Sequence, residues 1–224
     1  MYSILEHYLS TNHILMIGMI VTFILTFFLL EHPFSFLPSD QGRAFAVNGS
    51  LSKGKLRGVG FIFVLCFLIS SVLFLPIDVE YVIYAILLFA MMISGYLDDA
   101  SKTPWNEYKK GLIDLVISVV AVLTYMNFNS TTICFGADEI VIPKALFLIL
   151  GVILIWVSVN VTNCTDGVDG LCASLCSVTL LAFGVLFAPI LQKYAMANFL
   201  FLSVLFAYLY FNSSPSSMLM GDAG

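Results

Sequence analysis

The sequence has few charged residues, and its scarce cysteines and histidines form no metal-binding pattern. Only 10% of the 224 residues are charged, against about 25% in soluble domains. The five cysteines include no CxxC pair and the three histidines no HExxH motif, so neither a zinc site nor a disulfide framework is expected. The pI near 4.9 lacks the basic footprint of nucleic-acid binding, so no nucleic-acid partner is expected.

Apolar residues dominate instead, at 60% of the chain, with a mean hydropathy of +1.02. One aqueous core cannot hide that much apolar surface in a chain of this length, so the lipid bilayer is the expected solvent. Seven stretches reach the roughly 17 to 20 apolar residues that a membrane helix needs. They lie at 13–30, 58–75, 81–97, 111–127, 144–162, 171–189 and 195–211. We predict an all-α polytopic fold in one integral membrane domain, 1–224.

The positions of Lys and Arg predict the orientation of these spans. Seven basic residues follow the first and third spans: Arg43, Lys53, Lys55, Arg57, Lys102, Lys109 and Lys110. The opposite side holds two, Lys144 and Lys193. Because basic residues favour the cytoplasmic side, the N-terminus is predicted to lie outside, and its first apolar run is a span rather than a cleaved signal. The polar segment 128–143 is then an external loop.

Three acidic motifs fall on the predicted cytoplasmic side. "GYLDDASK", "NVTNCTDGVDGL" and "NSSPSSMLMGDAG" follow the third, fifth and seventh spans. Carboxylates at the mouth of a membrane bundle are costly to desolvate, so they often mark a functional site. In the first motif, Asp98 and Asp99 precede Lys102 in a D-D-x-x-K unit. Its simpler interpretation is a helix end at the membrane surface.

The second motif repeats a polar side chain every three residues. Asn160, Asn163, Asp166 and Asp169 would lie along one side if the backbone were helical throughout. Two amides and two carboxylates on one stripe suit oxygen coordination of Mg²⁺ or recognition of a polar ligand. The alternative is a polar helix end rich in turn-forming residues.

The third motif and a basic loop complete the candidate site. Asp222 lies between glycines, which suits a loop beside a metal-bound phosphate and equally suits an ordinary turn. The loop "SKGKLRGVG" carries Lys53, Lys55 and Arg57; it is either a topology anchor or a phosphate clamp opposite the acids, and it does not match the P-loop pattern. Lys109-Lys110-Gly111 is placed similarly before the fourth span. A Mg²⁺ ion held by Asp carboxylates would offset the charge of a diphosphate, and a free Asp could act as base or as electrostatic support.

In this order, the motifs resemble the polyprenyl-phosphate N-acetylhexosamine-1-phosphate transferase family, also called the glycosyltransferase 4 family. The resemblance runs from about Arg43 to the last residue and is most specific in "NVTNCTDGVDGL". Thr165 before Asp166 favours the branch that uses UDP-N-acetylmuramoyl-pentapeptide over the branches that use UDP-N-acetylglucosamine.

The resemblance implies Mg²⁺-dependent transfer of phospho-N-acetylmuramoyl-pentapeptide from its UDP conjugate to undecaprenyl phosphate, with release of UMP. It implies the bacterial cytoplasmic membrane, with the active site facing the cytoplasm, and leaves a homodimer open. Asp98 would lie at the lipid phosphate, while Phe211 and Gly221 would lie near the uracil. The expected catalytic residues are Asp98, Asp99, Asp166 and Asp169; the substrate-binding residues are Lys53, Lys55, Lys102, Asn160, Asn163, Phe211 and Gly221; the metal-binding residues are Asp222, Asp99 and Asn160.

The sequence departs from the family pattern in two places. The family loop K-x-G-T-P-T-M-G-G is here "KGKLRGVG", so either Lys53 or Lys55 could take the family's lysine role. The sequence also stops at Gly224, inside the third motif, where the family continues to about ten spans and a histidine cluster. A C-terminally truncated member is therefore expected. The alternatives are the same chemistry with UDP-N-acetylglucosamine, an inactive fragment that packs against another protein, and a transporter.

Overall fold

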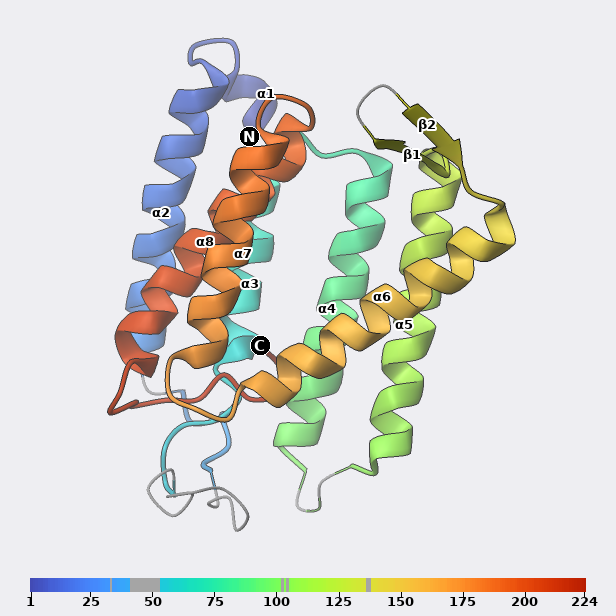
Figure 1. Ribbon diagram of the computed structural model, residues 1–224. Helices are drawn as coiled ribbons and strands as arrows, with labels where there is room; N and C mark the ends of the chain where they lie inside the picture. The colour runs from blue at the N-terminus through green and yellow to red at the C-terminus, as the bar shows by residue number, and fades with distance from the viewer. Residues whose placement is uncertain (33, 41–52, 102, 104, 136–137) are drawn as a thin grey trace.

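The apolar stretches fold into long helices that run side by side in a computed structural model (Figure 1). The structure describes residues 1–32, 34–40, 53–101, 103, 105–135 and 138–224. Within these ranges the helices are α1 Tyr2–Leu5, α2 Thr11–Glu31, α3 Gly60–Phe74, α4 Val79–Asp99, α5 Glu107–Phe128, α6 Lys144–Thr165, α7 Leu171–Phe187 and α8 Gln192–Asn212, and the strands are β1 Thr132–Phe135 and β2 Asp138–Val141.

Helices α2 to α8 match the seven predicted spans one for one. Five of them are long and apolar enough to cross a membrane, while α3 and α7 have 15 and 17 residues. The prediction of an all-α, multi-pass membrane protein is confirmed. The sequence did not lead us to expect the short helix α1, nor the antiparallel hairpin that β1 and β2 form within the polar segment 128–143.

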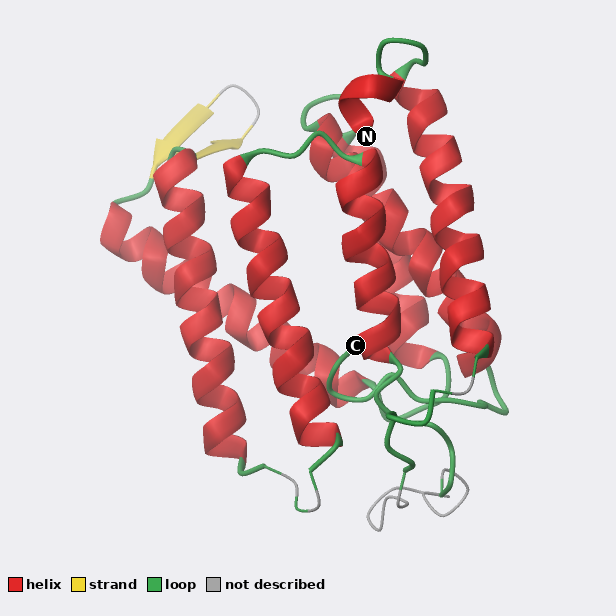
Figure 2. Ribbon diagram, turned by 180° about the vertical axis from the view of Figure 1, so that it is seen from behind, coloured by secondary structure: helices red, strands yellow, loops and turns green. Residues whose placement is uncertain are grey.

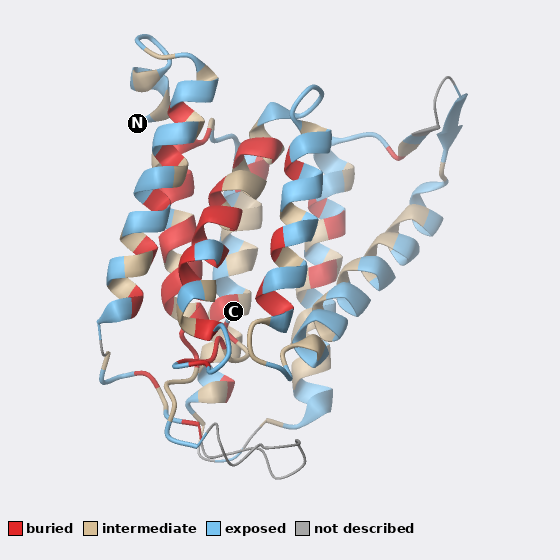
Figure 3. Cartoon of the chain, turned by 60° about the vertical axis from the view of Figure 1, so that its left-hand side comes forward, coloured by how far each residue is buried: buried red, intermediate tan, exposed pale blue. Residues whose placement is uncertain are grey.

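The best-buried part of the molecule is the group α2, α3, α7 and α8 (Figure 3). One face of α2 buries a residue on each successive turn, and the inner members of this row are small: Gly18, Thr22 and Thr26. A row of small residues spaced by four lets two membrane helices approach closely. Gly18 accordingly lies against Leu200 of α8, which is fully buried.

Helices α4, α5 and α6 form a more open layer beside this group. α4 packs against α3 and α5, and α6 packs mainly against α5. α6 crosses obliquely over α4 and α5 (Figures 1 and 2) and contains no fully buried residue. The indole Nε1 of Trp156 donates to the carbonyl oxygen of Gly111, 2.9 Å away, and so attaches α6 to the start of α5.

The two ends of the bundle differ in polar content. The connections after α4, α6 and α8, which hold the three acidic motifs, lie at one end, and the hairpin lies at the other (Figures 1 and 2). The three acidic motifs therefore lie on the same side of the bundle, as the sequence predicted. That this side faces the cytoplasm stays a prediction.

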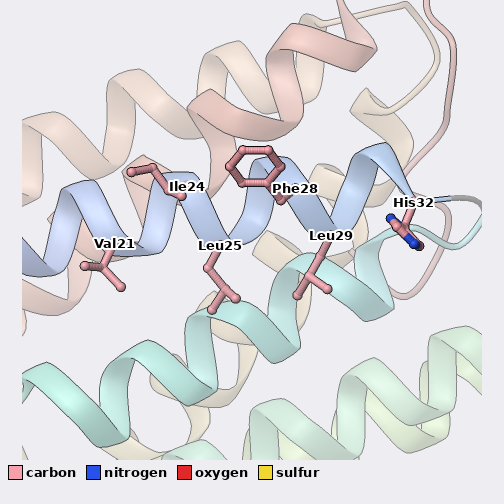
Figure 4. A pocket seen from close by; sticks show the side chains of 6 residues that line it. All are labelled: Val21, Ile24, Leu25, Phe28, Leu29 and His32. Carbon is pink, nitrogen blue, oxygen red and sulfur yellow. The ribbon is translucent and has the colours of Figure 1, made fainter.

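An apolar groove of about 530 Å³ follows the surface of α2 (Figure 4). Its lining consists of Val21, Ile24, Leu25, Phe28, Leu29 and His32. His32 marks the end of the groove at the C-cap of α2. Because the lining is almost wholly apolar and α2 is a candidate membrane span, we expect the acyl chains of the bilayer to fill it.

A polar network holds α4, α5 and α8 together at the end away from the acidic motifs. Glu80 is buried in α4 and accepts hydrogen bonds from the side-chain amide of Asn129, at 2.7 Å, and from the hydroxyl of Tyr84, at 3.1 Å. Asp78 caps α4 and pairs with Lys193 of α8. Its slight burial favours a higher pKa, but the bond from Lys193 holds the pKa of Asp78 below its usual value.

We predict that Asn129→Ala lowers the stability of the protein by about 1–3 kcal/mol, because the buried Glu80 then loses its nearest hydrogen-bond donor. Thermal unfolding of the purified protein in detergent measures the effect. Asn198→Ala is the matched control, since the amide of Asn198 donates to the carbonyl of Tyr194 within its own helix. Equal shifts in melting temperature for the two variants would contradict the network's role.

Candidate active site

The first and third acidic motifs meet at the end of α4. Asp98 and Asp99 are the last two residues of that helix, and Asp222 lies in the segment after α8. The backbone N–H of Asp222 donates to Oδ2 of Asp99 over 2.8 Å. Residues 123 positions apart in the sequence therefore share one hydrogen bond at the centre of the site.

Two glycines make this contact sterically feasible. The carbonyl of Asp222 rests on Gly95, one turn before Asp99, where a Cβ would lie 1.9 Å from that carbonyl oxygen. Gly221 has a φ of +69°, in the left-handed region that glycine adopts without strain. A Cβ on Gly221 would also lie 2.2 Å from Oδ2 of Asp99. Glycine at both positions thus lets the third motif lie directly on α4.

Backbone hydrogen bonds fix the third motif against the basic loop. The N–H of Leu219 donates to the carbonyl of Leu56 at 2.8 Å, and the N–H of Gly60 donates to the carbonyl of Met220 at 3.0 Å. Asn212, which is buried at the end of α8, donates to the carbonyl of Met218 and accepts from the N–H of Gly170. The basic loop, the second motif and the third motif therefore form one connected surface.

Arg57 of the basic loop is surrounded by carboxylates. Its Nε lies 2.7 Å from Oδ1 of Asp99, a close ion pair in which the N–H is not aligned for a hydrogen bond. The terminal nitrogens lie 3.4 Å from Oδ1 of Asp222 and 3.7 Å from Oδ1 of Asp40. Asp40 is almost fully buried, and its Oδ2 has no hydrogen-bond partner. One guanidinium therefore holds three acids from three segments.

Lys110, in the first turn of α5, supplies the second cation. Its ammonium contacts one carboxylate oxygen each of Asp98 and Asp222. The other oxygen of Asp98 accepts from the backbone N–H of Trp105 at 2.6 Å. Burial of Asp222 favours a higher pKa, but Lys110 and then Arg57 stabilise the anion and hold the pKa of Asp222 below its usual value.

The charges of this cluster do not cancel. Four carboxylates, Asp40, Asp98, Asp99 and Asp222, surround Arg57 and Lys110, which leaves two negative charges. Carboxylate oxygens are the ligands that Mg²⁺ prefers, so donor chemistry and charge both suit one divalent cation. Among the described residues, however, no group of three His, Cys, Asp or Glu side chains is already arranged as a metal centre. An ion would have to rearrange the pairs with Lys110 or Arg57.

A second polar cluster lies beside the first. Both carboxylate oxygens of Asp169 accept from Ser216, one from its backbone N–H at 2.9 Å and one from its hydroxyl at 2.8 Å. Lys55 donates to the same hydroxyl at 2.8 Å, and its ammonium lies 3.9 Å from Asp169. Lys55 thus joins the basic loop to the second and third motifs, whereas Lys53 is exposed.

The predicted polar stripe is only partly helical. α6 includes Asn160 and Asn163 and ends at Thr165, so Asp166 becomes its C-cap and Asp169 lies in the turn beyond. The amide of Asn160 donates to the carbonyl of Trp156 in its own helix, and Asn163 is exposed. Because α6 ends before Asp166, Asp169 lies in the connection to α7, where it contacts Ser216.

The remaining predicted residues take different positions. Gly221 touches Asp99, as described above. Phe211 packs against Phe27 of α2, with 5.2 Å between ring centroids, and its carbonyl accepts from the N–H of Ser217. Lys102 lies outside the described residues. The uracil, metal and phosphate roles expected for these positions stay predictions.

Sequence reasoning left several site residues out of its candidate set. Arg57 and Lys110 were visible as basic residues near the acids, but spacing alone did not show which acid each one contacts. Asp40 stands outside the three motifs, and Ser216 lies within the third motif but was not singled out there. Asn212 offered the one usable signal, an amide at the end of a long apolar run, where an unsatisfied polar group would be costly.

The fold and the site define a polytopic membrane protein with a cluster of acids and bases at one end of its helices. The sequence profile described as glycosyl transferase family 4 matches residues 81–224. The chain therefore belongs to glycosyl transferase family 4, which confirms the family that the motifs predicted.

Individual relatives agree with the family. The chain is 33% identical to the phospho-N-acetylmuramoyl-pentapeptide-transferase of Treponema pallidum, over 93% of this chain and 63% of that protein. It is 26% identical to the protein of the same name from Dictyoglomus turgidum, over 95% of this chain and 70% of the relative. The chain thus spans less than two thirds of the Treponema protein that it matches.

We predict that Gly95→Ala displaces residues 221–224 and lowers stability by about 1–3 kcal/mol or more, because the new methyl group would collide with a backbone carbonyl. Faster proteolysis of the C-terminal segment and a lower melting temperature are the measurements. Gly111→Ala is the control within a helix, since its Cβ would meet Trp156 at an ordinary 3.7 Å and alanine favours a helix by up to about 1 kcal/mol. Equal behaviour of the two variants would argue against the contact at Gly95.

Proposed function

We propose that this chain transfers phospho-N-acetylmuramoyl-pentapeptide from its UDP conjugate to undecaprenyl phosphate in a Mg²⁺-dependent reaction. The observation that carries the proposal is the meeting of Asp98, Asp99 and Asp222 with Arg57 and Lys110 at one end of the helices. Such a cluster can bind a divalent cation and phosphates close to a membrane surface, where the head group of a lipid phosphate would lie.

The proposed reaction exchanges one phosphoanhydride bond for another. An oxygen of undecaprenyl phosphate forms a bond to the phosphorus that carries the sugar, and the bond from that phosphorus to the oxygen of UMP breaks. The electron pair leaves with UMP. Bound Mg²⁺ would neutralise charge on the diphosphate during this exchange.

Residues of the chain would bind and orient the two substrates. Asp98 and Asp222 would provide oxygens to the cation, while Asp99 fixes the backbone of the third motif and holds Arg57 in place. Lys55 and Arg57 lie on the loop beside the acids and would bind phosphate oxygens as charge-assisted donors. Asp98 is also placed at the helix end to orient the attacking lipid phosphate or to take up a proton.

The donor is proposed from the relatives and from one residue. The Treponema and Dictyoglomus proteins are named for phospho-N-acetylmuramoyl-pentapeptide transfer, and Thr165 before Asp166 favours the same donor. UDP-N-acetylglucosamine is the alternative donor for the same chemistry.

We predict that membranes containing the protein exchange labelled UMP with the UDP-sugar when Mg²⁺ and undecaprenyl phosphate are both present. Asp98→Asn and Asp222→Asn should each reduce the exchange on the order of 100-fold, because each removes a charged oxygen donor from the site. The control is Asp78→Asn, which removes the same charge at the other end of α4 and keeps a residue that caps helices well. Unchanged exchange in the two site variants would refute the assignment.

A second prediction separates the donors and the metal. UDP-N-acetylmuramoyl-pentapeptide should support the exchange and UDP-N-acetylglucosamine should not, with EDTA stopping the reaction and Mg²⁺ restoring it. Thin-layer separation of labelled UMP from nucleotide-sugar measures both effects. Exchange with UDP-N-acetylglucosamine alone would assign the chain to the other donor. Ion flux in proteoliposomes without UMP release would favour a transporter.

A further inference from the structure

Lys110 occupies a position between two acids that do not belong to the same segment. Its ammonium contacts Oδ2 of Asp98, at the end of α4, and Oδ2 of Asp222, in the segment after α8. A single cationic atom therefore bridges the oxygens that a bound ion would share. We propose that Lys110 is an internal cation that holds the divalent-cation position in the ion-free protein and gives it up when an ion binds.

This inference rests on the proposed function in one respect, namely that a divalent cation binds at these acids. It goes further by proposing that Lys110 competes with the divalent cation for the acids. A residue that merely supports the site would weaken ion binding when it is removed. A residue that competes with the ion would strengthen ion binding when it is removed.

The two cations of the cluster differ in how firmly they are held. Arg57 is held by carboxylates from three segments, and its own backbone N–H donates to the carbonyl of Pro38 at 2.9 Å. Lys110 carries its charge on a flexible four-carbon stem and pairs with acids from only two segments. Rotation of the side chain alone can therefore take Lys110 away from two acids, whereas the departure of Arg57 would break ion pairs with three.

The net negative charge of the cluster explains why Lys110 stabilises the ion-free protein. Without Lys110, Asp98 would lose its ammonium partner and Asp222 would keep the pair with Arg57, and like charges at close range would repel one another. With Lys110 in place the net charge of these groups is −2, and after Lys110 leaves it is −3, so the departing ammonium exposes a more negative site to the ion. Lys110 thus stabilises the ion-free protein and lowers its affinity for the ion at the same time.

Mn²⁺ is a suitable probe, because free Mn²⁺ is counted directly by electron paramagnetic resonance without substrate or turnover. Purified Lys110→Gln should bind Mn²⁺ about tenfold more tightly than the unmodified protein, which corresponds to about 1.4 kcal/mol. In EDTA the same variant should melt at a lower temperature, and Mn²⁺ should raise its melting temperature by more than it raises that of the unmodified protein.

The control removes the same charge one residue away. Lys109 is exposed and its ammonium lies over the ring of Trp105, 3.2 Å from the centroid. Lys109→Gln should leave the Mn²⁺ affinity unchanged within about twofold, since the ammonium of Lys109 is exposed and packs on Trp105 instead of on the acids, and exposed charges are screened by salt. Equal tightening in both variants would mean that net charge, rather than the position of Lys110, sets the affinity, and this would overturn the inference.

Other outcomes separate the inference from the proposed function. Saturable Mn²⁺ binding that Lys110→Gln weakens or leaves unchanged would overturn the inference while the metal site stands. Absence of saturable Mn²⁺ binding by the unmodified protein would refute both the metal site and the inference. UMP exchange that persists in EDTA would instead reject the metal dependence of the reaction.

A measurement on the unmodified protein covers the case in which Lys110→Gln does not fold. Amines paired with carboxylates react slowly with acylating reagents, so Mn²⁺ should increase acylation of Lys110 several-fold, as read by mass spectrometry of its peptide. Acylation of Lys109 should not change. Equal labelling of Lys110 with and without bound Mn²⁺ would show that it does not leave the acids.

Discussion

The carboxylate of Asp99 is the contact on which the site depends. One of its oxygens accepts the backbone N–H of Asp222, and the other pairs with Arg57. The end of α4, the segment after α8 and the basic loop therefore have one side chain in common. Because a buried carboxylate is costly unless it is paired, and the side chain of Asp99 is fully buried, each of these segments stabilises the placement of the others.

Different helices supply the apolar core and the charged residues of the site. α2, α3, α7 and α8 bury most of the apolar core, whereas α4 and α5 contribute Asp98, Asp99 and Lys110 from a layer with far fewer buried residues. α4 is attached at both of its ends by polar groups, at Glu80 on one side and at Asp99 on the other. The charged groups thus lie on helices that contribute little to the buried apolar core.

The spans and the shared end of the acidic motifs could be predicted from the sequence, because both depend on local patterns of residues. Long apolar runs predict the spans, and the alternation of sides places all three acidic motifs at one end. Pairings such as Arg57 with Asp99, or Lys55 with Asp169, depend on where loops cross, and spacing along the chain carries no such information. The stripe from Asn160 to Asp169 shows the same limit: a repeat of three residues indicates a shared face only while the helix continues, and α6 ends at Thr165.

The separation of 123 positions between Asp99 and Asp222 has a consequence for biosynthesis. A ribosome that inserts this chain into a membrane makes Asp40, Asp98 and Asp99 long before the segment that completes their surroundings. Once Lys110 has been synthesised, Arg57 and Lys110 can neutralise two of these three early acids. A partly inserted chain therefore carries three of these acids against two bases, so most of the early negative charge has a partner before the last helix is in place.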